Sequence, residues 1–157
     1  MSEVTLRPVE DADLDVLFEL MRDPESVAMA AFTTEDPDDR AAFDAHTRRN
    51  LANPETTNRV IVADGRVVGS IASFVIEGDT EITYWVDRAV WGQGVAGRAV
   101  ALLLDEVTVR PLHARVASDN AGSLRVLTRA GFEIVGTDVG YAAARKAEIE
   151  ETILRLG

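Results

Sequence analysis

Three closely spaced glycines are the residues of this chain whose type and spacing point most directly to chemistry. They lie in the segment Trp91-Gly92-Gln93-Gly94-Val95-Ala96-Gly97-Arg98, which leads into an apolar run with helical spacing, Val95 to Val107. Glycine lets the backbone approach a ligand closely, and the amide groups at a helix N-terminus face anions. The segment therefore predicts a site for a phosphorylated ligand.

Three interpretations of this glycine loop are open from the loop alone. Its Gly-x-Gly-x-x-Gly spacing matches the dinucleotide fingerprint, with Asp119 as a ribose-binding acid about twenty residues on. Gly94 and Ala96 match the Gly-x-Gly/Ala loop with which acetyltransferases hold the pyrophosphate of coenzyme A. A tight turn without a ligand is the third. Residues 87–90 separate the loop from the preceding strand, and too few residues follow for a dinucleotide fold, so that interpretation is disfavoured.

Composition narrows the class of protein and of ligand. The 157 residues, 46% hydrophobic and 27% charged, fit one globular domain over residues 1–157. There is no apolar run of the ~20 residues that span a bilayer, and no signal pattern, so we expect a cytoplasmic chain without membrane contact. The net charge of −11 argues against nucleic acid and favours a cationic ligand by steering, unless it serves solubility alone.

Metal and thiol chemistry are not expected. The chain has no cysteine, which removes disulfides, thiolate metal sites and an acyl-cysteine intermediate. No cluster of histidines and carboxylates has the spacing of a metal site. His46 is expected to pack on the inner face of a helix, together with Ala42, Phe43 and Leu51.

Hydrophobic periodicity and turn signals predict the elements that position the loop. Asp11 or Asp13 is expected to cap a first helix that ends near Pro24, and 25–37 are expected to be irregular. Further helices are predicted at about 38–50, 95–109 and 120–130, and strands at 4–8, 60–63, 67–76, 81–87, 113–117, 132–137 and 149–156. This order predicts an α/β fold, antiparallel early and parallel around the glycine loop.

Two segments resemble the GNAT N-acetyltransferase superfamily and, within it, the RimJ/RimL-like branch. The first is Tyr84-Trp85-Val86 followed by Trp91 to Ala96, and the second is Ser118 to Phe132, which is similar to the family's Asn-x-x-Ser-x-x-Val-Leu-x-x-x-Gly-Phe run. With the order of elements, the resemblance covers essentially the whole chain. It implies a single GNAT-like domain with a mixed central sheet of six to seven strands, about four helices, and splayed parallel strands at the cofactor cleft.

The resemblance also implies where acetyl-CoA, the co-substrate, would bind. The pantetheine arm would pair with the backbone of Tyr84, Trp85 and Val86, between the strands 81–87 and 113–117. Asn120 and Ser123 would reach the pantetheine arm and the thiol, although Asn120 is also a helix cap, so the two roles need different atoms. The pyrophosphate would lie on the loop, at Gln93, Gly94, Val95, Ala96 and Gly97, with Arg98 adding positive charge unless it is a solvated surface arginine.

The implied activity is N-acetyl transfer to an amine, a protein N-terminus or a small amine, by direct attack on the thioester. Many family members carry a tyrosine seven residues after the asparagine to protonate the leaving thiolate, but Leu127 stands there, so Ser123 is the candidate acid. Glu81 is the candidate base, because it lies on the strand beside the proposed cleft and the resemblance implies a glutamate there. Strand alternation places it on the face of Trp85, where an apolar wall would raise its pKa. An exposed strand-end glutamate is the alternative.

The acceptor amine is not specified by the sequence. Its pocket is expected among the first two helices and the segment 25–37, with Phe32, Trp85 and Tyr141 as substrate contacts. The resemblance also allows a homodimer. The alternative function is a non-catalytic module that binds or senses acyl-CoA, which the leucine at position 127 keeps open.

Overall fold

A seven-stranded sheet in the order β1-β2-β3-β4-β5-β7-β6 organises the computed structural model, which describes residues 3–157. Neighbouring strands are antiparallel except β4 and β5, which are parallel. The strands are β1 (Val4–Pro8), β2 (Thr57–Ala63), β3 (Arg66–Ile76), β4 (Asp79–Val86), β5 (Leu112–Ala117), β6 (Glu133–Ala142) and β7 (Ala147–Leu156). The α/β fold with a mixed sheet and splayed parallel strands is confirmed.

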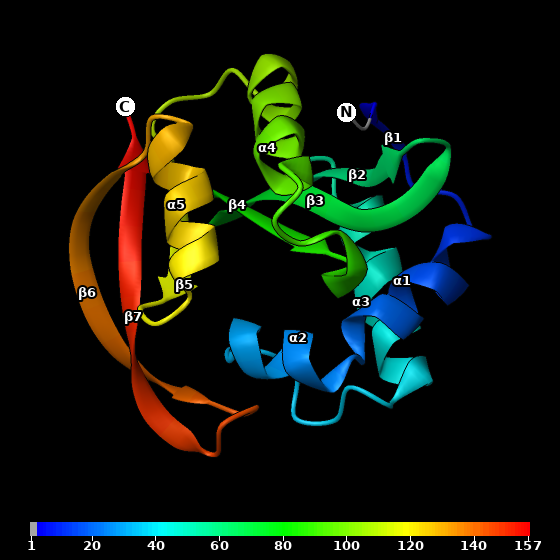
Figure 1. Cartoon of the computed structure of the whole chain (residues 1–157), viewed down its shortest axis with the longest axis horizontal. Coiled ribbons are helices and arrows are strands. Elements are labelled where there is room, and N and C mark those ends of the chain that lie inside the picture. Colours follow the sequence, from blue (N-terminus) through cyan, green and yellow to red (C-terminus); the bar gives the residue numbers. More distant parts are fainter. Residues whose placement is uncertain (1–2) are drawn as a thin grey trace.

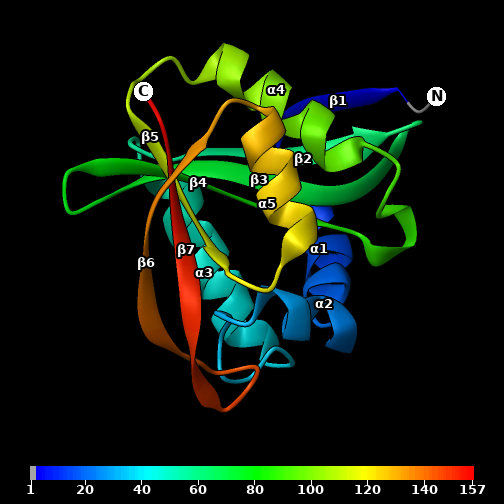
Figure 2. The same cartoon turned by 60° about the vertical axis from the view of Figure 1, so that its left-hand side comes forward.

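Helices cover the sheet on both faces (Figures 1 and 2). One face carries α4, beside which α5 packs, and the other carries α1 and α3. The helices are α1 (Asp13–Met21), α2 (Pro24–Ala30), α3 (Arg40–Ala52), α4 (Val95–Glu106) and α5 (Ala121–Arg129), with a short 3-10 helix, η1 (Arg88–Val90), before the glycine loop. No helix in residues 3–157 is both long enough and apolar enough to cross a bilayer.

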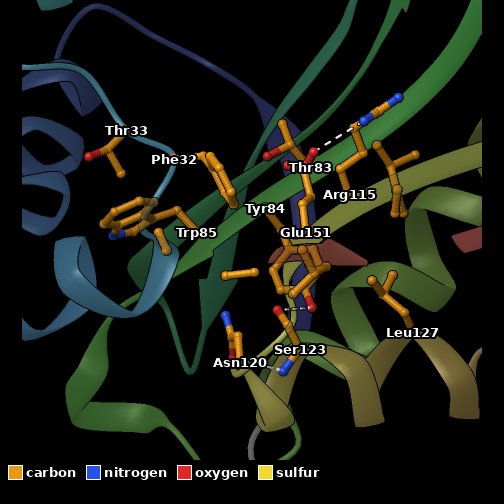
Figure 3. A pocket seen from close by; sticks show the side chains of 15 residues that line it. Phe32, Thr33, Thr83, Tyr84, Trp85, Arg115, Asn120, Ser123, Leu127 and Glu151 are labelled. Atoms are coloured by element: carbon orange, nitrogen blue, oxygen red, sulfur yellow. Dashed lines mark hydrogen bonds and ion pairs between the residues drawn. The ribbon is translucent and has the colours of Figure 1, made fainter. Parts of the chain in front are cut away.

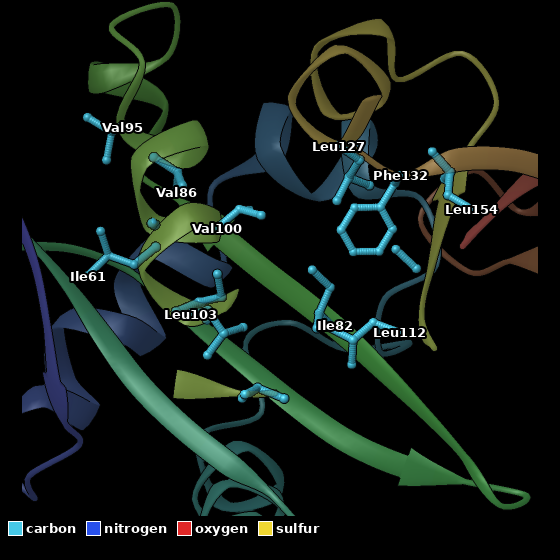
Figure 4. Close-up of a cluster of buried hydrophobic side chains, with 14 of the residues drawn as sticks. Ile61, Ile82, Val86, Val95, Val100, Leu103, Leu112, Leu127, Phe132 and Leu154 are labelled. Carbon is cyan, nitrogen blue, oxygen red and sulfur yellow. The ribbon is translucent and has the colours of Figure 1, made fainter. Parts of the chain in front are cut away.

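The main core lies between α4 and the sheet and continues beneath α5 (Figure 4). The apolar residues of α4 repeat at helical spacing, so one face of the helix is buried while the other is solvated. Its most deeply buried members are Ala99, Val100 and Leu103, which pack with Ile61, Ile82, Leu112, Leu127, Phe132 and Leu154. This packing holds the N-terminus of α4, and therefore the glycine loop, against the end of β4.

The two parallel strands separate soon after they meet. Their register holds only at Thr80 with Leu112 and Glu81 with His113, although β4 continues to Val86 and β5 to Ala117. On its other edge β4 pairs with β3 along its whole length. Within the described sheet, the β5 side of residues 82–86 therefore has no strand partner, and its backbone groups face the gap between the two strands.

Close backbone contact holds β4 against β3 at the end of this gap. A Cβ built on Gly69 of β3 would lie 2.0 Å from the carbonyl oxygen of Trp85. No other residue type fits there, because backbone rather than a flexible side chain would be overlapped. Gly69 thus sets how closely the strands approach where Trp85 enters the site.

The N-terminal helices differ from the expectation in two places. Residues 25–37 are not irregular throughout, because Asp23 caps the seven-residue helix α2, accepting a hydrogen bond from the Ser26 amide. Neither Asp11 nor Asp13 caps α1: the residue before its first turn is Ala12, without a side-chain cap. Asp13 instead forms a two-pronged ion pair with Arg7 of β1, at 2.8 Å for both contacts.

The expected inner face of α3 is wrong. His46, Ala42 and Leu51 are exposed, and none of the residues of α3 is fully buried. The half-buried stripe is displaced round the helix and is mostly polar, because α3 packs on the outside of α1 and β2 rather than over the core. That stripe is Arg40, Phe43, Asp44, Thr47 and Asn50.

Candidate active site

Two adjoining cavities lie beside the gap between β4 and β5. We call the larger the ligand groove: it has a volume of about 570 Å³ and is lined by residues of β4, the glycine loop and α5, with α2 on its far side. The smaller, the inner pocket, has a volume of about 160 Å³ and lies between residues 30–33, β4 and β5. Both cavities are lined by Ala30, Tyr84, Trp85, Asn120 and Ser123. These five residues form the junction of the two cavities.

The glycine loop leaves the start of α4 open to the groove. Gly92 and Gly94 both have φ of +79°, a left-handed conformation that glycine adopts without strain. Gly94 is the N-cap of α4 and no side chain caps the helix, so its first amide groups are available to a ligand. Gly94, Val95, Ala96 and Gly97 line the groove, whereas Gln93 is exposed beside it. Arg98 is half-buried next to Gly94.

Asn120 caps α5 and faces the junction with a different atom. Its side-chain oxygen accepts a hydrogen bond from the Ser123 amide at 3.2 Å, as expected for a cap. Its side-chain nitrogen points toward the cavity in Figure 3. The side-chain oxygen of Asn120 thus serves the helix cap, and its side-chain nitrogen remains for a ligand in the cavity.

Ser123 is hydrogen-bonded to a partner that the sequence did not indicate. Its hydroxyl lies 2.7 Å from the Tyr84 hydroxyl, which reaches the junction from β4 (Figure 3). Burial raises the pKa of Tyr84, and the hydrogen bond with Ser123 opposes part of that rise. From the sequence only the backbone of Tyr84 was assigned a role. Strand alternation could have indicated the contact of its side chain, since it directs Tyr84 toward the side of the sheet that α5 covers.

The inner pocket combines aromatic walls with an ion cluster. Phe32, Thr33 and Trp85 line one side (Figure 3), and the indole nitrogen of Trp85 donates to the Leu20 carbonyl at 3.1 Å, which fixes the ring. At the opposite end Arg115 of β5 contacts Glu151 of β7 at 3.1 Å. Sequence analysis missed both ends of this ion pair, because only the long-range pairing of β5 with β7 brings them together.

Three carboxylates share the single guanidinium of Arg115. Besides Glu151, it lies 3.7 Å from Asp138 and 3.8 Å from Glu81. This cluster therefore carries a net negative charge. Burial raises the pKa of Glu81, whose side chain is 14% exposed. Glu81 lies at the start of β4, outside the residues that line the inner pocket, and four residues from Trp85 along an extended strand.

The remaining predicted contacts are dispersed. Phe32 and Trp85 line the inner pocket, whereas Tyr141 on β6 is 60% exposed and lines neither cavity. Phe43, which was expected on the inner face of its helix, packs on Phe18 with ring centroids 5.4 Å apart and lines neither cavity. Within residues 3–157 there is no group of three or more histidines and carboxylates that could hold a metal ion.

Comparison with known proteins agrees with the fold. A model of the acetyltransferase (GNAT) domain family matches residues 3–133. The chain is similar to the uncharacterized N-acetyltransferase p20 of Bacillus licheniformis, with 27% identity over 152 residues that cover 90% of this chain and 85% of that protein.

Solved structures show the same fold at low identity. RimJ of Mycobacterium smegmatis, in complex with CoA-disulfide, matches with a TM-score of 0.82 and 24% identity, over 98% of this chain and 81% of the RimJ chain. Spermidine N-acetyltransferase of Vibrio cholerae, in complex with CoA and spermine, matches with a TM-score of 0.80 and 15% identity, over 98% of this chain and 94% of that one.

Proposed function

Because the chain belongs to the acetyltransferase (GNAT) domain family, we propose that it transfers an acetyl group from acetyl-CoA to an amine by direct attack of the amine on the thioester. The observation that carries the proposal is the continuous path from the unpaired edge of β4 to the open N-terminus of α4. Such a path suits a ligand with an amide-containing arm and a pyrophosphate. RimJ and spermidine N-acetyltransferase, which share the fold, are both seen in complex with CoA or its disulfide.

We assign acetyl-CoA to the ligand groove. The backbone of residues 84–86 would pair with the pantetheine arm, and the amides of residues 93–97 would hold the pyrophosphate. Asn120 would donate from its side-chain nitrogen, since its oxygen is occupied by the cap. Charge-assisted hydrogen bonds of about 1.5–3 kcal/mol each would offset repulsion between the cofactor and the acidic protein. Acetyl-CoA would supply the activated acyl group.

We assign the acceptor amine to the inner pocket. The net negative cluster at Arg115 favours a cationic acceptor over an anionic one, and the volume of about 160 Å³ suits a small amine or the end of a chain. Spermidine N-acetyltransferase, seen in complex with spermine, supports a small amine as the acceptor. The likeness to RimJ supports placing the chain in the RimJ/RimL-like branch of the family. A small cationic amine is the acceptor class that the pocket fits best.

Such an acceptor needs a base. Deprotonating an amine of pKa ~10.4 at pH 7 costs roughly 4–5 kcal/mol, whereas an α-amine of pKa ~8 costs about 1 kcal/mol. We propose Glu81 for this role, acting through water, because burial raises its pKa from its usual value and brings it closer to that of the amine. Glu151 is the second candidate because it lines the inner pocket itself.

Calorimetric titration with acetyl-CoA, followed by thiol release from acetyl-CoA with a panel of small amines, tests the function. We expect micromolar binding that is lost in Gly94→Glu, and thiol release with at least one cationic amine. NADH serves as the control ligand and should not bind.

The alternative function predicts a different combination of results. A module that senses acyl-CoA would bind acetyl-CoA tightly but release no thiol with any amine, and the leucine at position 127 is the observation that favours it. Absence of acetyl-CoA binding would contradict both functions and leave the glycine loop with a structural role.

A further inference from the structure

Five residues line both cavities and so form their junction, and two of them carry a hydroxyl group. Of its five residues, Ala30 has no acidic proton, the Trp85 N–H is donated to Leu20, and the Asn120 oxygen caps α5. The remaining two are Tyr84 and Ser123, whose oxygens are 2.7 Å apart. Where the acyl-donor groove meets the acceptor pocket, this hydroxyl pair is the available source of a proton.

The reaction in the proposed function requires such a proton. Breaking the C–S bond of a thioester leaves the electron pair on sulfur, and a thiolate with the pKa of a simple thiol, about 8.5, leaves more readily if it is protonated as it departs. A phenol has a pKa of about 10, whereas an aliphatic hydroxyl is a far weaker acid. Tyr84 is therefore the stronger acid of the pair.

We propose that the Tyr84 hydroxyl protonates the departing sulfur, and that Ser123 positions it by donating a hydrogen bond to the tyrosine oxygen. This inference rests on the proposed function. The new C–N bond forms as the C–S bond breaks, the Tyr84 proton passes to sulfur, and the proton that the amine loses is returned to Tyr84 through the base and solvent. The products are an N-acetyl amine and a free thiol, with Tyr84 regenerated.

The surroundings of the pair suit this division of roles. The Ser123 amide is held by Asn120, which fixes the first turn of α5 and so the direction of the serine side chain. A phenol oxygen can accept one hydrogen bond and still donate its own proton. Leu127, which stands where many family members carry a tyrosine, is 1% exposed in the core. Tyr84 thus places on β4 the phenol group that α5 does not carry at position 127.

Titration of the thiol of bound CoA tests the proposal without any acceptor. The ultraviolet absorbance of the thiolate is followed against pH for CoA bound to the full chain. Donation from Tyr84 stabilises the thiolate, so we expect its pKa to lie about one to two units lower when CoA is bound to the wild type than to Tyr84→Phe. Ser123→Ala should raise the pKa of the bound thiol as well, but by less than Tyr84→Phe does. Thr128→Val is the control, since it removes an α5 hydroxyl that bonds the Leu124 carbonyl instead.

Steady-state kinetics with an accepted amine give the second readout. Tyr84→Phe should lower kcat about 10²-fold or more with KM for acetyl-CoA changed less than about threefold, and Ser123→Ala should lower kcat less. The thermal midpoint of each variant shows whether it is folded. A loss confined to Ser123→Ala would make serine the donor, and an unchanged thiol pKa in Tyr84→Phe would overturn the proposal.

Failure of the underlying function looks different from failure of this inference. If the wild type does not bind CoA, the proposed function fails and the role of Tyr84 fails with it. If CoA binds and no amine is acetylated, the thiol titration alone decides whether Tyr84 donates to the sulfur. If the wild type is active and Tyr84→Phe is equally active, the function stands and the inference is overturned.

Discussion

Gly97 lies in the first turn of α4 with an ordinary backbone, and apart from its chain neighbours and the backbone of its own helix no heavy atom lies within 4 Å of the place a Cβ would take. An added methyl group would therefore meet no other part of the protein, yet it would stand in the lining of the ligand groove. Gly94, by contrast, needs its positive φ. Position 97 thus separates the requirements of the fold from those of the ligand.

Replacing Gly97 by alanine should stabilise the protein while weakening acetyl-CoA binding. Alanine in a helix is favoured over glycine by about 0.5–1 kcal/mol, so the free energy of unfolding should rise. The affinity for acetyl-CoA should fall about tenfold, because the methyl group occupies space that the pyrophosphate needs. Chemical denaturation and calorimetric titration measure the two quantities.

Gly136→Ala on β6 is the matched control, since a Cβ there also meets nothing within 4 Å but lies outside the groove. It should leave acetyl-CoA affinity unchanged. An unchanged affinity in Gly97→Ala would mean that the ligand does not pass over the first turn of α4.

Local signals explain which single residues could be predicted. Asn120 precedes a helical run and Gly94 belongs to a glycine pattern, so the cap and the left-handed turn follow from neighbours in sequence. The contact between Tyr84 and Ser123 spans 39 positions and that between Arg115 and Glu151 spans 36. Such contacts depend on how strands and helices pack, and no local pattern encodes them.

At the scale of elements, one ion pair joins the two sides of the site. Arg88 of η1 contacts Asp23, the N-cap of α2, at 2.9 and 3.1 Å, and Glu25 at 3.3 Å. The short helix α2 borders both cavities, whereas η1 leads into the glycine loop. The pair therefore ties the helix that borders both cavities to the segment that leads into the glycine loop.

This tie should weaken in acid. The hydrogen bond from Arg88 and the bond from Ser26 lower the pKa of Asp23 from 3.8 to about 2. Because the folded pKa is the lower one, the stabilisation is complete above pH 3.8 and is lost as the pH falls toward 2. The protection factors of the α2 amides in hydrogen exchange, which compare each rate with that of an unprotected amide at the same pH, should therefore fall across that window in the wild type.

Asp23→Asn tests the charge without removing the cap, since asparagine is also a good N-cap. We expect low protection factors of the α2 amides at neutral pH and no further drop in acid. Glu19→Gln, which removes an exposed partner of Arg22 on α1, is the control and should keep the wild-type acid step. The same acid step in Asp23→Asn would assign the titration to another carboxyl group.

Element prediction succeeded where turn and capping signals agreed with periodicity. The hairpins of β2, β3 and β4, the helix α4 and the helix α5 were placed to within a few residues. The helix α2 was missed because its seven residues are too few to show a period, although Asp23 and Pro24 are a start signal. The face of α3 was misplaced because its half-buried stripe is mostly polar, with Phe43, which packs on Phe18 of α1, as its one apolar member.

At the scale of the whole molecule, the net charge of −11 acts on both substrates in opposite directions. A cationic acceptor is attracted to the protein and anionic acetyl-CoA is repelled, and dissolved salt screens both effects. Raising ionic strength from about 0.05 to 0.5 M should lower kcat/KM for a polyamine several-fold and raise kcat/KM for acetyl-CoA.

Initial rates across a salt series measure both parameters. A monoamine is the control and should show a shallower fall than a polyamine, because it carries less positive charge. Equal falls for acetyl-CoA and the polyamine would mean that salt acts on the folded protein rather than on the approach of its substrates.

The overall strand order was only partly predictable. Consecutive hairpins and the parallel pair follow from the order of elements along the chain. However, β7 lies between β5 and β6, so the last strand enters the sheet beside β5 instead of extending its edge. Both sides of a closing hairpin offer similar hydrogen bonds, so no local signal distinguishes the two orders; in the structure β7 is the inner strand and its Leu154 lies in the core.

The two tryptophans of the chain, Trp85 and Trp91, both line the ligand groove, and both indole nitrogens donate to backbone carbonyls. One is partly buried at the junction and the other is 41% exposed beside the glycine loop. The intrinsic tryptophan fluorescence of this protein therefore originates entirely in the lining of the ligand groove. The molecule carries its own optical reporter of occupancy, which needs no label and no engineered residue.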